Sequence, residues 1–145
     1  MIRIPVPPDR KDQLETPPWL YEWFNRSFHF THDVACTPQN AKAGYLGPDT
    51  LKIPWGPRNW LNPPYSDPNP FMYKAYTESQ AGKLVVALVK YDHSTQWWNT
   101  WVKYHAIQVP IPWRVRFYLD GQPTTEVGNF PSVGLIYLPA LERGE

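Results

Sequence analysis

The chain has 145 residues, of which 42% are hydrophobic, so it is long enough for one domain with a single core. Its formal net charge of +1 provides no overall attraction to nucleic acid, and its single cysteine, Cys36, excludes an intramolecular disulfide and a cysteine-built metal site. No apolar run approaches the length of a membrane span and the N-terminus lacks the apolar core of a signal peptide, so we expect a cytoplasmic protein with no membrane partner. The histidines lack the spacing of metal ligands, and we expect no metal site.

The start of the chain is rich in proline and polar side chains. We therefore predict an N-terminal arm over residues 1–15 and a single domain over residues 16–145. Thr16 and two prolines then precede apolar residues at helical spacing, which predicts a helix over residues 17–26. Thr16 stands where a helix N-cap is expected, and its hydroxyl could instead contact a ligand.

Two acidic residues are candidates for ligand binding. Residues 28–35 alternate as a short strand does, and Asp33 lies near the end of that strand. Ligands of open α/β sheets bind outside the carboxyl ends of the strands, so Asp33 lies where a cofactor is expected, although a helix-cap or turn role would also explain it. Asp49, in the turn-rich stretch 43–59, could accept a hydrogen bond from a ligand amine or form an Asx-turn.

The sequence Asn62-Pro63-Pro64-Tyr65 carries the most specific chemistry. Its two prolines fix the backbone and remove two N–H donors, so the loop is stiff. The Asn62 side-chain oxygen and the Pro63 carbonyl can accept hydrogen bonds from a planar exocyclic amine, while Tyr65 stacks on the attached ring. Such a loop would make an aromatic amine nucleophilic. A proline-rich turn with a buried tyrosine is the alternative.

The second half of the chain contains the remaining predicted elements. A continuous β-branched run predicts a buried strand over residues 84–89, between helices over residues 71–81 and 95–104. Trp97 and Trp101 share a face of the second helix and could pack on the sheet or stack on bases. Three further strands are predicted over residues 106–109, 115–119 and 133–138, and residues 121–131 are expected to form a hairpin loop between the last two. This order predicts an α/β fold whose sheet is mostly parallel with a C-terminal antiparallel hairpin.

With its motifs taken in order, the chain resembles the phage-type DNA N-6-adenine methyltransferase (Dam) family from about residue 11 to residue 138. The Asn-Pro-Pro-Tyr motif alone is only moderately specific for this family, whereas the full series of motifs in this order is much more specific. The residues that carry the resemblance are Lys11-Asp12, Thr16-Pro17, Asp33-Val34-Ala35, Asn40-Ala41-Lys42, Asp49-Thr50-Leu51, Trp55, Asn62 to Ser66, Val85 to Leu88, Thr95, Trp97-Trp98, Arg116-Phe117 and Pro131-Ser132.

The resemblance implies a Rossmann-like fold with helices on both faces of the sheet. It also implies an adenine-specific DNA methyltransferase, encoded by a phage or prophage and acting in the host cell, that transfers the methyl group of S-adenosylmethionine to N6 of adenine in DNA. Carried over by residue, the implied cofactor contacts are Thr16, Pro17, Asp33 and Asp49. The implied catalytic residues are Asn62, Pro63 and Tyr65, and the expected DNA contacts are Pro64, Ser66, Lys90 and Arg116.

Two other functions remain open on the sequence. A protein with the same fold could bind nucleic acid without catalytic activity. Alternatively, the protein could methylate N4 of cytosine, because the loop could hold that similar amine. The chain has no length for a separate target-recognition domain. We therefore expect loose sequence specificity, supplied by the loops 66–70, 91–94 and 120–131.

Overall fold

The computed structural model describes residues 2–127 and 130–141, and its centre is a six-stranded sheet. The strand order is β2-β1-β3-β4-β8-β5, in which β2, β1, β3 and β4 are parallel and β8 is antiparallel to both of its neighbours. The strands are β1 (His32–Asp33), β2 (Gly44–Tyr45), β3 (Arg58–Leu61), β4 (Leu84–Lys90), β5 (Ile107–Pro110) and β8 (Ser132–Tyr137). The predicted mostly parallel α/β sheet with antiparallel C-terminal structure is confirmed.

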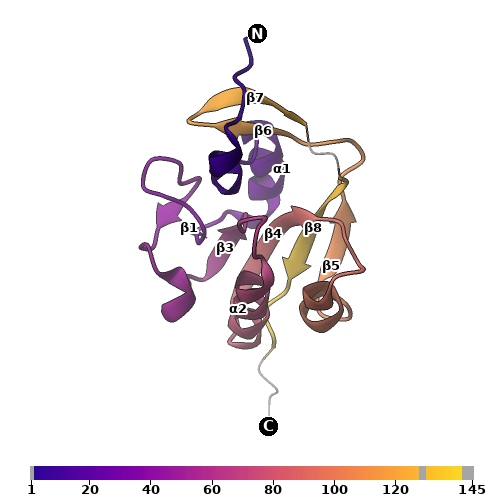
Figure 1. Ribbon diagram of the computed structural model, residues 1–145. Coiled ribbons are helices and arrows are strands. Elements are labelled where there is room, and N and C mark those ends of the chain that lie inside the picture. The colour runs from indigo at the N-terminus through magenta and orange to yellow at the C-terminus, as the bar shows by residue number, and fades with distance from the viewer. Residues whose placement is uncertain (1, 128–129, 142–145) are drawn as a thin grey trace.

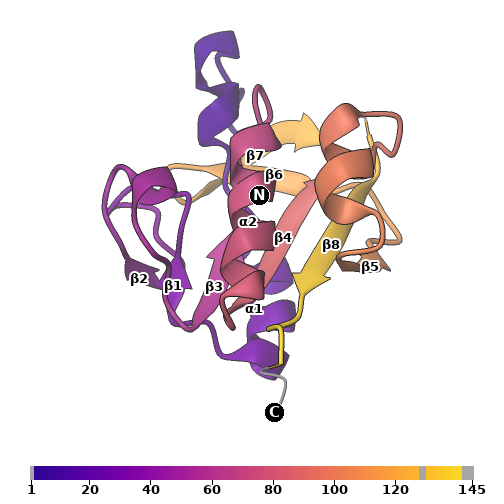
Figure 2. The same cartoon turned by 90° about the horizontal axis from the view of Figure 1, so that it is seen from below.

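Helices cover both faces of this sheet because the side chains of the central strand β4 are apolar on both sides. Helix α1 (Pro18–Phe28) packs on the face that carries Val86 and Leu88. Helix α2 (Asn69–Gln80) and the π-helical turn Trp98–Val102 pack on the face that carries Val85 and Ala87. Figure 2 shows these two helical segments on the same side of the sheet.

Gly134 in β8 shows how closely α1 approaches the sheet. A Cβ atom added to Gly134 would lie 2.4 Å from Cζ of Phe24. Because Phe24 is 3% exposed and packed in the core, its ring has little room to move. We predict that Gly134→Ala lowers the free energy of unfolding by about 1–3 kcal/mol, as overpacked cores do.

Urea denaturation measures this effect, with Gln122→Ala on an exposed strand position as the control. Unchanged urea midpoints for both variants would contradict the close packing of Phe24 on β8.

The sequence-based boundaries are wrong at the first and third strands. The sequence pattern predicts one strand over residues 28–35, but Phe28 ends α1 and His29 adopts a left-handed conformation (φ 50°) that ends the helix. The Asn25 side chain accepts a hydrogen bond from the Phe30 N–H, which further fixes this turn, and only His32–Asp33 pairs in the sheet. Strand β3 lies partly within the turn-rich stretch 43–59. The prolines of this region come before and after the strand, so they remove none of the hydrogen bonds that β3 makes to its neighbours.

The C-terminal hairpin forms, but its second strand differs from the predicted one. Strand β6 (Arg116–Leu119) pairs with β7 (Gln122–Val127), which lies in the predicted loop 121–131, and β8 instead enters the main sheet between β4 and β5. The reason is the two-residue turn Asp120-Gly121, whose φ angles of 50° and 75° suit a tight hairpin. Residues 128–129 of the predicted loop lie outside the described residues, as do residues 142–145 of the predicted domain.

The predicted helix over residues 95–104 is shorter than expected. Its regular part is the π-helical turn Trp98–Val102, and Tyr104 adopts a positive φ of 69° just beyond it. A left-handed residue cannot continue a right-handed helix, so the segment ends there.

The N-terminal segment lies along the β6–β7 hairpin. A 3-10 helix, η1 (Pro8–Gln13), has no buried residue, but backbone hydrogen bonds hold Ile4 to Pro123 and Thr125, and Glu15 to Tyr118. Residues 4–15 and the hairpin 116–127 are called the cap below. Figure 1 shows the hairpin lying across the end of the molecule from which the N-terminus extends. The division of the chain at residue 15 stays a prediction.

Candidate active site

The sheet topology places a site between strands β1 and β3. The chain leaves β1 for β2 on one side, whereas it leaves β3 for β4 on the other side, so the connections diverge between β1 and β3. Such a switch point leaves a crevice at the carboxyl ends of the strands, where ligands of α/β sheets bind. Asp33 ends β1 and Asn62 directly follows β3, and both line one small cavity of about 20 Å³.

Asp33 is held at this crevice by backbone N–H groups. Its carboxylate accepts hydrogen bonds from the N–H of Lys42 (3.0 Å) and of Ala35 (3.4 Å). Its residue is only 4% exposed, and burial raises the pKa of the Asp33 carboxyl, while these two hydrogen bonds lower it. The local bond to Ala35 also fits the turn role considered from the sequence, so Asp33 both shapes the turn and borders the cavity.

Two polar atoms at this cavity are buried without a partner. Within the described residues, Oγ1 of Thr16 and Oδ1 of Asn62 are inaccessible to solvent and make no hydrogen bond. A buried polar atom without a partner costs about 1–3 kcal/mol, so such atoms are expected to meet a ligand. Their shared position indicates a polar binding site.

The helix-cap prediction for Thr16 is wrong. The N-cap of α1 is Pro17, and no side chain caps this helix end. Thr16 precedes the N-cap Pro17 and so lies outside the helix, and its hydroxyl makes no hydrogen bond to the N–H groups of the first turn. The ligand role of Thr16 stays a prediction, and buried Pro17 restricts the backbone next to it.

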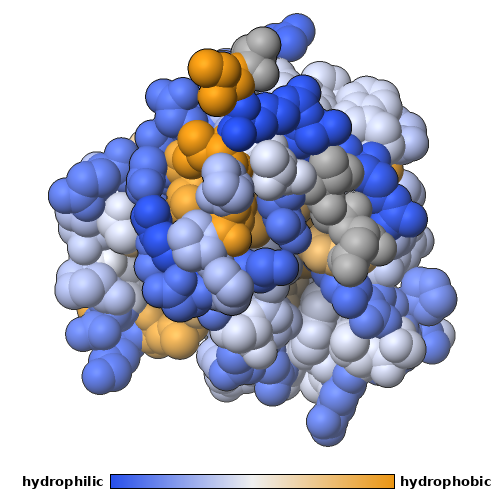
Figure 3. Space-filling view, turned by 45° about the horizontal axis from the view of Figure 1, so that its top comes forward, coloured by the Kyte–Doolittle hydropathy of each residue, from blue (hydrophilic) through white to orange (hydrophobic). Residues whose placement is uncertain are grey.

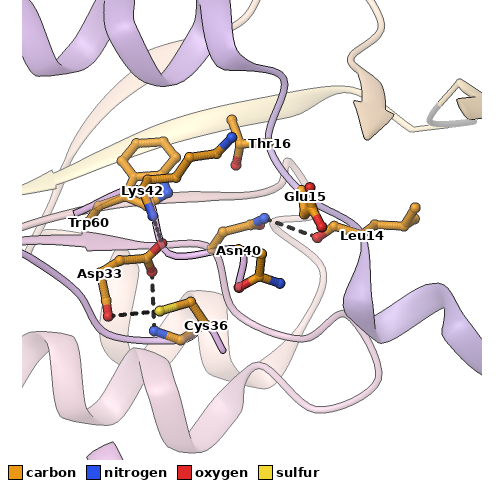
Figure 4. A pocket seen from close by; sticks show the side chains of 10 residues that line it. Leu14, Glu15, Thr16, Asp33, Cys36, Asn40, Lys42 and Trp60 are labelled. Atoms are coloured by element: carbon orange, nitrogen blue, oxygen red, sulfur yellow. Dashed lines mark hydrogen bonds between the residues drawn. The ribbon is translucent and has the colours of Figure 1, made fainter. Parts of the chain in front are cut away.

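The Asn62 amide is oriented by the cap. Its Nδ2 donates a hydrogen bond to the carbonyl of Leu14 at 3.4 Å, which leaves Oδ1 for a ligand. In Figure 4 the carbonyl of Leu14 closes one side of the cavity, opposite Asp33 and Cys36. Cap and sheet therefore meet at the Asn62 side chain.

Tyr65 borders a second and larger cavity. Its ring packs against Phe117 and Phe130, with ring centroids 5.6 Å and 5.5 Å away. Burial raises the pKa of the Tyr65 hydroxyl, so the phenol stays neutral around pH 7. The cavity has a volume of about 500 Å³, and it brings together the predicted residues Pro63, Pro64, Tyr65, Ser66 and Lys90 with Trp97 and Phe130.

Asp12 fixes the far end of the Asn-Pro-Pro-Tyr loop. Its carboxylate accepts a hydrogen bond from the Ser66 N–H at 3.0 Å, and the Ser66 hydroxyl donates to its other oxygen. The cap thus holds the loop at both ends, through Leu14 at Asn62 and Asp12 at Ser66. The functional prediction from sequence missed Asp12, Leu14, Lys42 and Phe130. Of these, Asp12 and Lys42 stand in motifs of the family resemblance, which was the available signal.

Three predicted residues, Pro17, Asp49 and Arg116, lie outside these cavities. Asp49 is exposed, although its neighbours Pro48 and Thr50 line a further cavity of about 250 Å³ that also contacts Asn62. Arg116 is exposed at the start of β6 in the cap. The cofactor roles of Pro17 and Asp49 and the DNA role of Arg116 stay predictions.

Residues 2–127 and 130–141 contain neither a cluster of metal ligands nor a membrane-spanning helix. No cluster of three or more His, Cys, Asp or Glu residues there is arranged to hold a metal ion. No helix in these ranges combines the length and apolar character needed to cross a bilayer.

Comparison with known proteins identifies the family of this chain. A family described as DNA N-6-adenine-methyltransferase (Dam) matches residues 5–137. A relative from Haemophilus phage HP1 (strain HP1c1), named DNA N-6-adenine-methyltransferase, is 35% identical over 100 residues, which cover 64% of this chain and 58% of the relative. The match thus spans less than two thirds of the relative's length, and no solved structure matches the chain. On the match over residues 5–137, the chain belongs to the DNA N-6-adenine-methyltransferase (Dam) family.

Proposed function

We propose that this protein transfers a methyl group from S-adenosylmethionine to the exocyclic N6 of adenine in DNA. The observation that carries the proposal is the buried, unpartnered Oδ1 of Asn62. Asn62 lies between the small cavity at Asp33 and the loop residues that line the 500 Å³ cavity at Tyr65. An acceptor at this junction suits an amine that must face a methyl donor, and membership of the Dam family supports this assignment.

The residues at the carboxyl ends of β1 and β3 fit the cofactor. S-adenosylmethionine supplies an activated methyl group on a sulfonium cation, and it carries an amino acid and a nucleoside. The Asp33 carboxylate suits the positive charges, and the Thr16 hydroxyl supplies an unpartnered polar group beside it. The cavity of about 250 Å³ that adjoins Asn62 and runs to Pro48 and Thr50 would take the nucleoside, and Asp49 lies between these two residues in the sequence.

The larger cavity fits a nucleobase. Its volume of about 500 Å³ lies in the usual range for ligand sites, and three aromatic rings border it, those of Tyr65, Trp97 and Phe130. N6 of adenine is paired and stacked inside a duplex, so the base must leave the helix to reach this loop. Tyr65 would then stack on the base, while Lys90 at the cavity and Arg116 on the cap contact phosphates.

The chemistry needs positioning more than a strong base. Oδ1 of Asn62 and the carbonyl of Pro63 accept the two hydrogens of the amine, which aims its lone pair at the methyl group. As the new N–C bond forms, the bond from the methyl group to the sulfonium would break and release S-adenosylhomocysteine. The methylated nitrogen is acidic and would then lose its extra proton to water, so no base has to remove a proton beforehand. Placement of the amine and a preorganised acceptor therefore account for the rate.

We expect loose target specificity because only short loops are positioned to contact base edges. Base-edge contacts would come from the loops 66–70 and 91–94 and from the described part of 120–131, and each good contact contributes only about 1–3 kcal/mol. Figure 3 shows that the cap end of the molecule is largely hydrophilic around a narrow apolar band, as suits a wet and polar DNA interface.

We predict different effects for two substitutions of Tyr65. Tyr65→Ala should weaken DNA binding by about 1–3 kcal/mol because base stacking is lost, and Tyr65→Phe should keep most of the affinity because the ring remains. Fluorescence anisotropy with labelled DNA measures both, with the exposed Tyr73→Ala as the matched control. Wild-type affinity in a folded Tyr65→Ala variant would refute the stacking role.

A transfer assay with two mixed-sequence duplexes tests the proposed function. One duplex contains only A·T pairs and the other only G·C pairs, and genomic DNA controls for a target sequence absent from both. Transfer of labelled methyl groups to the A·T duplex and to adenine in genomic DNA is expected. Transfer only to cytosine would favour N4 chemistry, and DNA binding without any transfer would favour the inactive DNA-binding protein.

A further inference from the structure

Lys42 is a half-buried lysine at the candidate cofactor site. It lines the 20 Å³ cavity beside Asp33 and also a cavity of about 510 Å³ between the cap and residues 37–42. In the part of the chain that the structure describes, the ion pairs formed by Lys and Arg involve Arg10, Lys11, Lys74 and Lys83, but not Lys42. Its ammonium group is therefore available for an anionic ligand.

The two charges at this site lie apart. The backbone N–H of Lys42 is bound to the Asp33 carboxylate, but the Lys42 side chain extends away from it, past Trp60 and toward Thr16 (Figure 4). A carboxylate and an ammonium group that border one cavity without pairing suit a ligand that carries both opposite charges. An α-amino acid in its zwitterionic form is such a ligand.

We propose that Lys42 binds the carboxylate of the amino acid part of S-adenosylmethionine, while Asp33 binds its ammonium group; this rests on the proposed function. A DNA phosphate is the other anion available to Lys42. The buried Asp33 and the inaccessible Thr16 and Asn62 oxygens around the small cavity favour a small ligand over a DNA backbone. The demethylated product, S-adenosylhomocysteine, keeps both charges, so it should compete well with the cofactor.

Calorimetric titration of three proteins with three probes tests the role of Lys42. The proteins are the wild type, Lys42→Gln, and Lys52→Gln as a matched change at an exposed lysine. The probes are S-adenosylhomocysteine, decarboxylated S-adenosylmethionine, which lacks only the carboxylate, and 5′-methylthioadenosine, which lacks the whole amino acid. We expect Lys42→Gln to weaken S-adenosylhomocysteine binding by about 10- to 100-fold, as loss of a charge-assisted hydrogen bond does, and to leave the other two probes within about twofold.

The probe pattern separates the possible failures. Equal weakening of the binding of all three probes by Lys42→Gln would overturn the carboxylate assignment, because two of the probes lack the carboxylate. Weaker DNA binding with unchanged affinity for S-adenosylhomocysteine would overturn it in favour of phosphate. If the wild type binds none of the probes, the proposed function itself fails, whereas binding that is indifferent to Lys42 overturns only this inference.

Discussion

Replacement of Asn62 by alanine is expected to reduce the single-turnover rate of methyl transfer by about 10²–10³, with little change in cofactor affinity. The Asn62 oxygen is buried and has no partner among the described residues, so it is available to the amine. Hydrogen bonding to the amine matters most as charge develops on the nitrogen, so its loss should affect the transition state more than the bound substrate.

A second variant separates the acceptor from the rest of the side chain. Asn62→Asp keeps an acceptor oxygen but loses the donor that binds the Leu14 carbonyl, and it should retain more activity than Asn62→Ala. Single-turnover assays, with cofactor and DNA affinities measured in parallel, give both comparisons. A folded Asn62→Ala protein that methylates DNA at the wild-type rate would refute the proposed mechanism.

Trp60→Ala is expected to lower the free energy of unfolding by about 3–5 kcal/mol, a large part of the stability of a typical domain. Trp60 is 1% exposed, and its ring contacts those of Tyr21, Phe24 and Phe30, with centroids between 5.4 and 5.8 Å away. Removing the indole leaves a cavity between α1 and the sheet, which surrounding rings can fill only in part.

Urea denaturation of Trp60→Ala and of Trp113→Ala tests this packing, because Trp113 is 56% exposed and its loss should matter far less. Trp60 also lines the cavity beside Asp33, so a weakened cofactor site is expected in the same variant. Similar urea midpoints for the two variants would contradict the central position of Trp60 in the core.

The parts of the site that follow from local sequence were predictable. The apolar run of β4 requires burial on both faces, and Asp33 and Asn62 come at or just after strand ends, so the sheet brings them to one edge. The two prolines after Asn62 fix the loop whatever its surroundings. Trp97 remained open between packing and stacking. The structure shows it packed against the core and also bordering the larger cavity.

The cap and its contacts with the loop could not be predicted from local patterns. Asp12 and Ser66 are 54 residues apart, and Leu14 and Asn62 are 48 residues apart, so no local sequence pattern predicts either contact. The β6–β7 hairpin did have a local sequence signal, the Asp120-Gly121 turn, but the prediction assigned residues 121–131 to one long loop. Thr16 is of a residue type typical of helix N-caps, and the local sequence does not show that Pro17 takes that position instead.

The most direct test of the central claim is the nucleoside composition of DNA from cells that express the protein and that lack other adenine methylation. Wild-type protein is predicted to produce N6-methyladenine, and Asn62→Ala, expressed at an equal level, is predicted to produce almost none. DNA that carries no N6-methyladenine after expression of the folded wild-type protein, or that carries equal amounts with both proteins, would contradict the account.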